Sequence, residues 1–548
     1  MRTIDRLTIE NSEATSLQLM QAAAHACFQA IDFHFSGDLA GKKAQILCGP
    51  GNNGGDGAAL AQELSRAGVH ADIVLFGNVE DTRGDARTNF EIVRKLAAAE
   101  AKSADQSRPL SFVECDGASA WDKLAQQRRD YDVIVDALFG TGLTRPLEGV
   151  FAEVVRHLAD RRRIRKTSSA GAPLIVSIDI PSGLNADSAK PIGPAVQSDL
   201  TVTFTAPKVA NVLPPASHAN GTLIVSDIGS PQALVNQAGP SLFVIEETDA
   251  RRWLMATRYT PDSFKNSHGH VLVIAGARGY TGAAVLCGNA AMRSGAGLVT
   301  IATPVSAQSS VAASVMPEVM TAALAETDRG AVSDEAIEHV AHFASKATVV
   351  AIGPGLSSAD ERTRRFVYQI VKRRQAPVVL DADALNCLAP WPADLQGSDH
   401  LPLILTPHPG EMLRLLGTTE KSALDDRVAA ARAFSTQHKV ILVLKGSRSL
   451  IAAPDGRVFI NPTGNAGLGT AGAGDTLTGI IAGFVAQSAA GFFDEADALL
   501  CVIAALYVGG LAADFAARDL GMRAMVASDI REHLCEVFCV LDPEGEMP

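Results

Sequence analysis

Short runs of apolar residues alternate along the chain with longer segments in which apolar residues recur every three or four positions. Continuous apolar runs are typical of strands buried on both faces of a parallel sheet, and the longer segments are typical of amphipathic helices. The first helix is predicted at 15–33, where Leu17, Met20 and Ala24 follow a cap at Thr15 or Ser16. The strands predicted in the first half lie at 44–48, 71–76, 111–115, 132–137, 174–178, 200–205 and 222–227.

The same alternation resumes after a polar stretch, 231–241, which contains proline and glycine and is predicted to be a linker. It separates an N-terminal domain, 1–230, from a C-terminal domain, 242–548. The predicted fold class is α/β, with a Rossmann-like doubly wound sheet in the first domain and a second α/β layer architecture after it. Strands of the second domain are predicted at 270–275, 298–302, 348–352, 377–381, 403–406, 441–445 and 458–460, and helices from 475 on.

The composition is that of a globular protein, and the net charge makes nucleic acid an unlikely partner. At 548 residues the chain exceeds one ordinary domain, and its net charge of −12 disfavours a nucleic-acid surface. The eight cysteines are scattered without a CxxC pair, as expected in a reducing compartment. The longest uncharged run, 498–513, falls short of the about 20 residues that span a bilayer. We therefore expect a soluble cytoplasmic protein without membrane or nucleic-acid partners, and we also expect a homo-oligomer.

A glycine-rich stretch at 461–479, NPTGNAGLGTAGAGDTLTG, precedes an apolar helical run. Gly472 and Gly474 permit positive φ angles and close approach of the backbone, and a helix N-terminus attracts anions. Asp475 lies where the helix starts, so it can cap the helix or take a proton from a bound hydroxyl. The alternative is a tight turn with a capping aspartate and no ligand.

Polar motifs follow the strands of the first domain, which is where doubly wound sheets bind ligands. GPGNNGGDG contains GxGxxG, but the acidic residue that a dinucleotide-binding unit carries after its second strand is missing. Asn53, Asp136 and Ser182 carry oxygen atoms suited to a hard cation, although a strand-end aspartate can instead cap the next helix. Lys208, after the sixth strand, is either an anion-binding residue or a surface lysine.

The ordered motifs GPGNNGGDG, DALFGTGL, IDIPSGLNAD and FTAPK resemble the NAD(P)H-hydrate epimerase domain over roughly residues 1–230. The resemblance implies interconversion of the R and S forms of nicotinamide hydrated at C6, with K⁺ bound. It implies potassium ligands at Asn53, Asp136 and Ser182, and an acid–base residue at Asp179. The residues implied to hold the hydrate are Asn52, Asn53, Gly54, Gly55, Asp56, Gly140, Thr141, Gly142, Leu143, Thr144, Arg145, Pro146 and Asp179.

The second domain has its own series of strand-end motifs, GARGYTGAA, GPGL, DADALN, TPHPGE and LKGS. LKGS is too short for a Walker A loop, so phosphate binding would rest on the glycine-rich stretch and the helix after it. His408 lies between two prolines at a strand end, which holds it rigidly. It is either a site residue or a satisfied core histidine.

Together with Lys265, GHVLVIAG, RSGAGLVT and GNAGLGTAGAGD, these motifs resemble the ribokinase-like α/β/α superfamily. The resemblance is closer to the ADP-dependent NAD(P)H-hydrate dehydratases, over roughly residues 240–545. It implies dehydration of the S hydrate while ADP is consumed with Mg²⁺. By motif, the hydrate would contact Ala283, Gly355, His408 and Asp475, and the nucleotide would contact Lys445, Gly446, Ser447, Arg448, Ser449 and Gly474.

The sequence thus predicts a bifunctional enzyme that acts on NADH hydrate and NADPH hydrate, with Asp179 and Asp475 as catalytic residues. Two other functions stay open. A small-molecule kinase shares the GAGD motif, although TPHPGEM and the fused first domain argue against it. The second alternative is a non-enzymatic scaffold, since domains that resemble the first half also serve in RNA-decapping complexes. The presence of Asn53, Asp136, Asp179 and Ser182 argues instead for an intact site.

Overall fold

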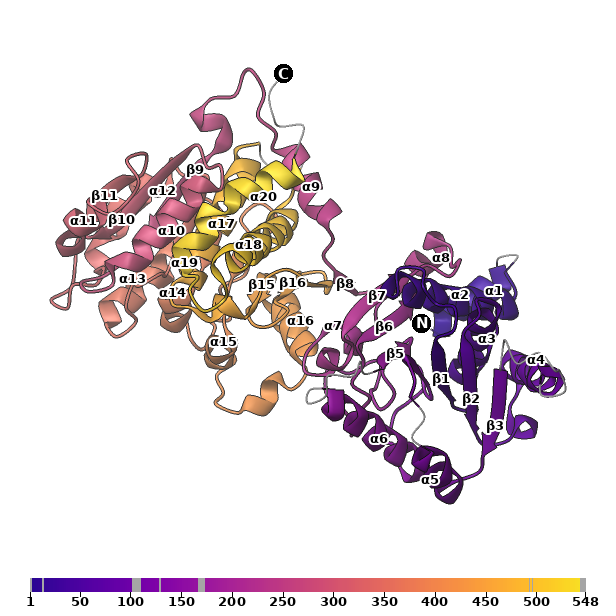
Figure 1. Cartoon of the computed structure of the whole chain (residues 1–548). Coiled ribbons are helices and arrows are strands. Elements are labelled where there is room, and N and C mark those ends of the chain that lie inside the picture. The colour runs from indigo at the N-terminus through magenta and orange to yellow at the C-terminus, as the bar shows by residue number, and fades with distance from the viewer. Residues whose placement is uncertain are drawn as a thin grey trace. The chain divides into compact units, whose positions relative to one another are not determined.

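The computed structural model describes residues 2–11, 14–100, 110–127, 130–165, 173–491, 493–494 and 496–542. The chain divides into two compact units, Met1–Pro240 and Ser241–Pro548, each with its own sheet and its own core (Figure 1). The α/β class expected from the sequence is confirmed for both units.

The sheet of the first unit is parallel and doubly wound. Each of its strands lies within one residue of its predicted bounds: β1 (Lys43–Cys48), β2 (His70–Phe76), β3 (Leu110–Cys115), β4 (Val133–Ala137), β5 (Leu174–Ile178), β6 (Leu200–Phe204) and β7 (Thr222–Ser226). The strand order is β3-β2-β1-β4-β5-β6-β7, and all neighbours pair in parallel. The strand order therefore reverses between β1 and β4, and doubly wound folds bind ligands at this switch point.

Helices cover both faces of this sheet. They are α1 (Arg2–Asn11), α2 (Ser16–His34), α3 (Asn52–Arg66), α4 (Gly84–Glu100), α5 (Ala118–Gln126), α6 (Gly149–Arg165), α7 (Val209–Val212) and α8 (Gln232–Gln237). Successive residues of a strand point to opposite faces. Ile46 of β1 accordingly shares a core with Leu60 of α3, whereas Leu47 shares a second core with Trp121 of α5. The continuous apolar runs in the sequence reflect this burial on both sides.

Two features of the first unit differ from the sequence prediction, and one cap is confirmed. Helix α1 was not predicted, because only Ile4, Leu7 and Ile9 of its ten residues are apolar. The segment predicted as a linker, 231–241, contains α8. The predicted cap at Thr15 is confirmed, since its hydroxyl accepts a hydrogen bond from the N–H of Gln18 at 3.2 Å.

The second unit has a mixed sheet in the order β11-β10-β9-β12-β13-β14-β15-β16-β17-β8. Its predicted strands are confirmed as β9 (His270–Ile274), β10 (Leu298–Pro304), β12 (Val349–Ile352), β13 (Val378–Leu380), β14 (Leu403–Leu405), β15 (Ile441–Leu444) and β17 (Val458–Ile460). Three strands were missed: β8 (Leu242–Val244), β11 (Met320–Leu324) and β16 (Leu450–Ala452). β8 and β16 have three residues each, and β11 is an edge strand with two alanines. Neighbours pair in parallel except β16, which is antiparallel to β15 and β17.

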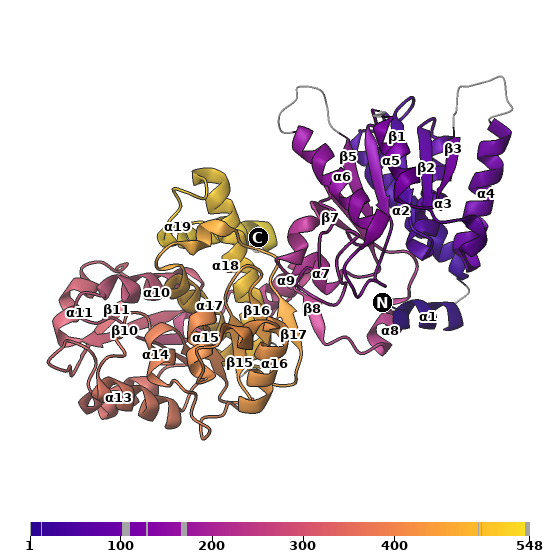
Figure 2. The ribbon, with the colours of Figure 1, turned by 90° about the horizontal axis from the view of Figure 1, so that it is seen from below.

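The helices of this unit also form two layers. They are α9 (Glu247–Ala256), α10 (Thr281–Arg293), α11 (Val305–Ala312), α12 (Ile337–Ala344), α13 (Glu361–Lys372), α14 (Ala382–Cys387), α15 (Pro409–Leu415), α16 (Arg427–His438), α17 (Ala473–Ala490), α18 (Ala498–Leu520), α19 (Ala527–Glu532) and α20 (Leu534–Leu541). Figure 2 shows α13 and α16 on one side of the sheet and α17 and α18 on the other. The α/β/α layers expected for the second domain are therefore present.

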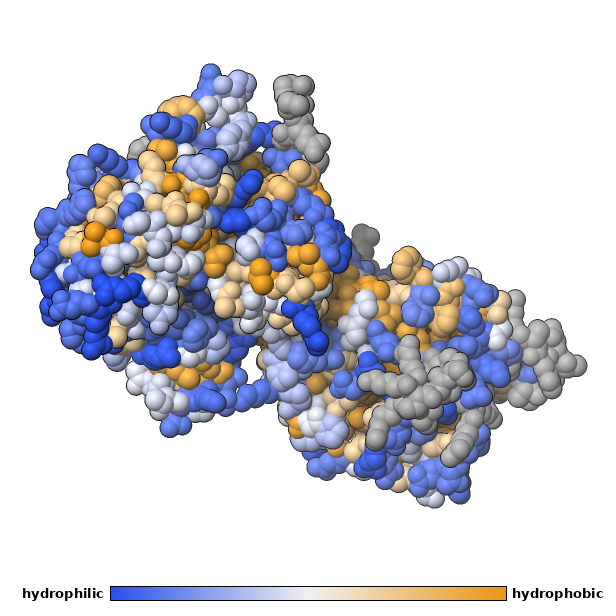
Figure 3. Space-filling view, turned by 60° about the vertical axis from the view of Figure 1, so that its left-hand side comes forward, coloured by the Kyte–Doolittle hydropathy of each residue, from blue (hydrophilic) through white to orange (hydrophobic). Residues whose placement is uncertain are grey.

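By length and composition alone, α18 could cross a membrane, but 67% of its most apolar window is buried within the unit. Val502 and Leu506 of this helix share a core with Val273 of β9 and Phe484 of α17. The surface in Figure 3 is mostly hydrophilic, with hydrophobic residues in smaller groups. We therefore identify α18 as the buried core helix that the sequence predicts for this segment.

Glycines allow α10 and α17 to pack with their backbones nearly in contact. A Cβ atom built on Gly479 would lie 2.1 Å from the carbonyl oxygen of Cys287, and one on Gly483 would lie 2.8 Å from that of Ala291. Neither position leaves room for a side chain. This packing fixes the position of the α17 N-terminus, at which Asp475 lies.

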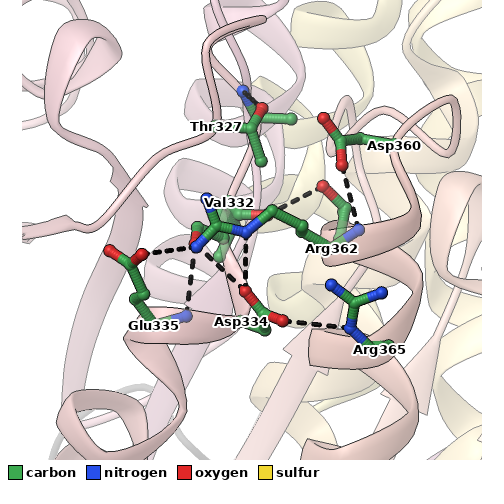
Figure 4. A network of polar contacts seen from close by, with 10 residues as sticks. Thr327, Val332, Asp334, Glu335, Asp360, Arg362 and Arg365 are labelled. Carbon is green, nitrogen blue, oxygen red and sulfur yellow. Dashed lines mark hydrogen bonds and ion pairs between the residues drawn. The ribbon is translucent and has the colours of Figure 1, made fainter.

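An exposed network of ion pairs fastens α13 to the short helix η4 (Asp334–Ala336) (Figure 4). Arg362 Nε lies 2.8 Å from Asp334 Oδ1, and Arg365 Nε lies 3.0 Å from Asp334 Oδ2. Asp360 caps α13 by accepting the N–H of Arg362 at 2.9 Å. The hydrogen bond from Arg362 lowers the pKa of Asp334. Because exposed pairs contribute at most about 1 kcal/mol, the network orients α13 more than it stabilises the unit.

The helix packing gives a stability prediction. Gly479→Ala should lower the free energy of unfolding by about 1–3 kcal/mol, because the added methyl group pushes α17 away from α10. Gly282→Ala is the matched control in α10, since a Cβ there meets nothing within 4 Å. Because Gly282 lies in the first turn of α10, alanine there should leave the free energy of unfolding unchanged or raise it by less than about 1 kcal/mol. Denaturant titration followed by circular dichroism measures both variants, and equal stabilities would contradict the packing argument.

Candidate active sites

A cavity of about 540 Å³ opens in the first unit at the carboxyl ends of β1, β4 and β5, where the strand order reverses. It brings together seven of the residues assigned to the hydrate from the sequence: Asn52, Asn53, Asp56, Gly140, Thr141, Gly142 and Asp179. Six assigned residues are not among those that line it: Gly54, Gly55, Leu143, Thr144, Arg145 and Pro146. Asp5, Ile9 and Ile228 line it without having been predicted.

Gly54 and Gly55 have a packing role that the sequence could not show. A Cβ atom on Gly54 would lie 1.8 Å from the carbonyl oxygen of Gly49, and one on Gly55 would lie 2.7 Å from the Cα of Ala86 in α4. These glycines therefore let α3 begin directly after the loop that follows β1. That close turn aims Asn52 and Asn53 into the cavity.

Asp179 and Lys208 form a buried ion pair at the cavity. Asp179 follows β5 with φ of +66°, a left-handed conformation that aspartate tolerates better than most residues. Lys208 donates to Asp179 Oδ1, and also to the hydroxyl of Thr203 at 2.8 Å and the carbonyl of Phe204 at 3.1 Å. Thr203 donates to the same Asp179 oxygen at 3.2 Å. The surface-lysine interpretation of Lys208 is therefore wrong, because its side chain is only 5% exposed.

Two more carboxyl groups face the same cavity. Asp56 has no hydrogen-bond partner in the described part of the chain, and burial raises its pKa well above the usual value, with Asp179 and Asp5 adding to the shift. Burial also raises the pKa of Asp5, although the Lys208 ammonium opposes this. The cavity thus presents three carboxyl groups and one ammonium group. Such a lining favours uncharged hydrogen-bond donors over phosphate.

Asp136 and Ser182 connect the loops that follow β4 and β5. The Asp136 carboxylate is fully buried and accepts four hydrogen bonds: from Ser182 Oγ at 2.6 Å, Ser177 Oγ at 2.7 Å, Ser182 N at 2.9 Å and Leu138 N at 3.3 Å. Burial raises the pKa of Asp136, and these bonds lower it in part. This clamp holds the Gly140 loop beside the Asp179 loop.

The predicted potassium ligands do not form a ready cation cage. The acceptor positions of Asp136 are filled, and Ser182 Oγ donates to that carboxylate. The third residue, Asn53, has a buried amide nitrogen without a partner among the described residues. A cation at Asp136 and Ser182 would have to replace existing hydrogen bonds.

In the second unit a buried lysine–aspartate pair lies beside the N-terminus of α17. Lys445, after β15, places its Nζ 2.6 Å from Asp381 Oδ1, and Thr478 of α17 donates to Asp381 Oδ2 at 2.8 Å. Burial lowers the pKa of Lys445, but the attraction of Asp381 and Glu411 outweighs it, so the pKa is raised. A Cβ on Gly474 would lie 3.3 Å from Lys445 Nζ, which places these two predicted nucleotide ligands together.

Asp475 lies in the first turn of α17 and is not the helix cap. The cap position belongs to Gly472, whose φ is +84°, so the capping interpretation of Asp475 is wrong. Burial and the nearby Asp381 raise the pKa of Asp475 to about 6, although Lys445 opposes the shift. A carboxyl group with a pKa near neutrality is suited to general-base catalysis.

Ala283 and Gly355, which are also predicted to bind the hydrate, lie side by side. Ala283 is in the first turn of α10, and Gly355 is in the loop after β12. A Cβ on Gly355, whose φ is +61°, would lie 3.0 Å from the Cβ of Ala283. Leu286 lies one turn further along α10, and a Cβ atom built on Gly472 would lie 2.4 Å from its Cδ1. The α10 N-terminus, the loop after β12 and the α17 N-terminus therefore converge.

His408 has a structural role at the N-cap of α15. Its Nδ1 accepts hydrogen bonds from the N–H groups of Gly410 at 3.0 Å and Glu411 at 3.3 Å. This arrangement needs an unprotonated Nδ1, and burial together with Lys445 lowers the pKa of His408. The proton of the neutral ring is therefore assigned to Nε2, which lies 3.4 Å from Glu411 Oε1. The ring is 51% exposed, so it is not a core histidine.

The loop 445–449, predicted to bind nucleotide, is shaped by Arg427 of α16. The Arg427 guanidinium donates to the carbonyl of Ser447 at 3.1 Å and to that of Leu444 at 3.3 Å. Ser449 closes the turn by donating to the carbonyl of Gly446 at 3.2 Å. Arg427 was not predicted, because it lies in a helix outside every motif.

Comparison with known proteins follows the same division of the chain. Residues 16–210 match the family described as YjeF-related protein N-terminus, and residues 271–536 match the family described as NAD(P)H-hydrate dehydratase. Among solved structures, the ADP/ATP-dependent NAD(P)H-hydrate dehydratase from Bacillus subtilis is 29% identical, with 55% of this chain and 98% of that chain covered and a TM-score of 0.45.

Three relatives are similar over nearly the whole length, and each is named bifunctional NAD(P)H-hydrate repair enzyme Nnr. The protein of Moorella thermoacetica is 40% identical, covering 100% of this chain and 97% of its own length. That of Salinibacter ruber is 34% identical, covering 100% and 96%, and that of Escherichia coli K12 is 30% identical, covering 94% and 88%. This full-length similarity shows that the chain belongs to the family of bifunctional NAD(P)H-hydrate repair enzymes.

Proposed function

We propose that this chain repairs hydrated NADH and NADPH in two steps. The first unit interconverts the R and S hydrates, and the second dehydrates the S hydrate back to NAD(P)H while ADP is consumed. One observation carries the proposal: in a chain similar along its whole length to bifunctional repair enzymes, each unit places a buried lysine–aspartate pair beside its candidate site.

In the first unit, epimerisation inverts the carbon that bears both the hydroxyl and the ring nitrogen. Loss of water from this carbon gives a planar centre, and return of water to the other face inverts it. Asp179 transfers the proton in both directions, and Lys208 and Thr203 hold its carboxylate in place. The acid-lined cavity supports this assignment, because the hydrated ring is uncharged and carries hydroxyl and amide donors.

Asp179→Asn should abolish racemisation of the R hydrate and leave turnover of pure S hydrate intact. Asparagine keeps the left-handed backbone conformation but cannot accept the proton. It also leaves Lys208 buried without a counter-charge, so a second variant, Asp179→Asn with Lys208→Met, removes the unpaired charge. Chromatography of the two hydrates without ADP measures the rate, and racemisation in either variant at the wild-type rate would contradict the role.

In the second unit, Asp475 takes the proton of the C6 hydroxyl as that oxygen attacks the terminal phosphoryl group of ADP, which releases AMP. Loss of phosphate together with a C5 proton then restores the ring double bond. The backbone N–H groups of Gly472, Ala473 and Gly474, at the helix N-terminus, hold the phosphoryl group, and Lys445 neutralises its charge.

Mg²⁺ belongs with the nucleotide in this proposal. It would be held mainly by the phosphates of ADP and would neutralise their charge during transfer. Carboxyl groups that the structure gathers near Lys445, those of Asp381 and Glu411, suit a hard cation at its protein side. The homo-oligomeric state, the cytoplasmic location and potassium binding stay predictions.

Asp475→Asn should reduce dehydration of the S hydrate about 10²–10⁴-fold, which is the typical contribution of a general base. The epimerase rate of the same chain is the internal control and should not change. The assay follows the return of absorbance of the dihydronicotinamide with ADP and Mg²⁺ present. A variant that dehydrates at the wild-type rate would remove Asp475 from the mechanism.

The pH dependence of dehydration should follow the same carboxyl group. Since burial raises the pKa of Asp475 to about 6 and the base must be ionised, the rate should fall tenfold per pH unit below about 6 and level off above it. Initial rates of S-hydrate turnover between pH 4.5 and 8 (roughly the range of acceptable stability) measure this profile. A flat profile through pH 6 would exclude Asp475 as the titrating base.

A further inference from the structure

Helix α1 forms a wall of the epimerase cavity that lies outside the matched family region. Asp5 and Ile9 line the cavity, whereas the matched region begins at residue 16. Ile9 is 42% exposed and is one of the apolar side chains that line the cavity. The family model, which covers residues 16–210, therefore does not include this wall.

The helix is docked through a separate face. Ile4 and Thr8, one turn apart, are buried, and Thr8 Oγ1 donates to Ser230 Oγ at 3.3 Å. Thr205, at the end of β6, donates to the same Ser230 oxygen at 3.4 Å. Since Thr205 lies three residues before Lys208, this chain of hydroxyl groups ties α1 to the segment that carries the lysine of the site.

One face of α1 packs against the first unit, a second lines the cavity and a third is exposed to solvent. Ile4 and Thr8 pack inward, Asp5 and Ile9 face the cavity, and the outer face carries an exposed ion pair between Arg6 and Glu10 at 3.5 Å. The docked face would hold the helix without any help from Asp5 and Ile9. These two side chains are accordingly free to contact a ligand.

The charges around Asp5 indicate which end of the substrate enters. Among the described residues that line the cavity, the carboxyl groups of Asp5, Asp56 and Asp179 face the ammonium of Lys208. Such a lining offers many hydrogen-bond acceptors and few cations, so it suits hydroxyl and amide donors better than a diphosphate. The hydrated nicotinamide ring is uncharged, offers a hydroxyl and an amide as donors, and has an apolar face.

We propose that α1 is the part of the epimerase site that selects the hydrated ring, with Asp5 accepting a hydrogen bond from a ring donor and Ile9 packing on the ring face. The inference rests on the proposed epimerase function and deepens it. The diphosphate and the adenosine lie toward the cavity mouth, away from the three carboxyl groups.

The test compares variants on two faces of one helix in the full-length protein. Racemisation of pure R hydrate of NADPH is followed without ADP, so that the dehydratase consumes nothing. Asp5→Ala should lower kcat/KM about 10–100-fold, mainly through KM, which is the effect of losing one hydrogen bond to a charged group. Ile9→Ala should lower it several-fold. The matched control, Glu10→Ala on the outer face, should keep the wild-type value.

Hydrogen exchange of residues 2–11 gives a readout independent of turnover. Exchange should slow when the hydrate binds wild-type protein, and the Asp5→Ala variant should exchange like wild type without ligand, which shows that α1 remains docked. Wild-type kcat/KM in both Asp5→Ala and Ile9→Ala would overturn the inference. If the wild type does not racemise the hydrate, the epimerase proposal fails, and exchange of α1 then decides the inference alone: slower exchange with hydrate supports it, and unchanged exchange overturns it.

Discussion

In each unit a lysine ammonium group is buried against an aspartate carboxylate at the carboxyl ends of parallel strands. Removing both charges from water costs several kcal/mol per ion, and their attraction offsets this only where further hydrogen bonds complete the pair. Thr203 supplies such a bond to Asp179, and Thr478 supplies one to Asp381. In each unit three side chains that lie apart in the sequence meet in this way: Asp179, Lys208 and Thr203 in the first, and Asp381, Lys445 and Thr478 in the second. The geometry of each site depends on this meeting.

The two pairs are used differently. In the first unit the paired aspartate itself faces the cavity, so the lysine holds the catalytic candidate directly. In the second unit the pair sets the electrostatic environment of another carboxyl group, since Asp381 raises the pKa of Asp475 and Lys445 lowers it. In the first unit the paired Asp179 is itself the proposed base. In the second unit the pair changes the pKa of the proposed base, Asp475, which lies on α17. The close contact between α10 and α17 matters for this reason, because a shift of α17 would move Asp475 relative to both charges.

The apolar runs were sufficient to locate the strands buried on both faces, because such strands have no solvent side to interrupt the run. β8 and β16 were missed, although β13, β14 and β17 are equally short and were found. α1 was missed because most of its residues are polar. Within the sites, strand-end motifs indicated which residues converge. Contacts between distant residues were not visible: Thr478 and Asp381 are 97 positions apart. Gly54 and Gly55 of GPGNNGGDG were predicted to bind the ligand, whereas the space beside them is filled by the backbone of Gly49 and by Ala86 and Met20.

The left-handed φ of Asp179 constrains how this position can change over evolutionary time. Glycine and asparagine fit the backbone there with little strain, and either would remove the carboxylate while leaving the turn intact. Either would also leave Lys208 buried without its counter-charge, which costs about 3–5 kcal/mol in comparable pairs. A lineage that no longer needed the chemistry would therefore still be selected to keep this aspartate for stability. Conversion of such a domain into an inert scaffold would require the lysine to change first or at the same time.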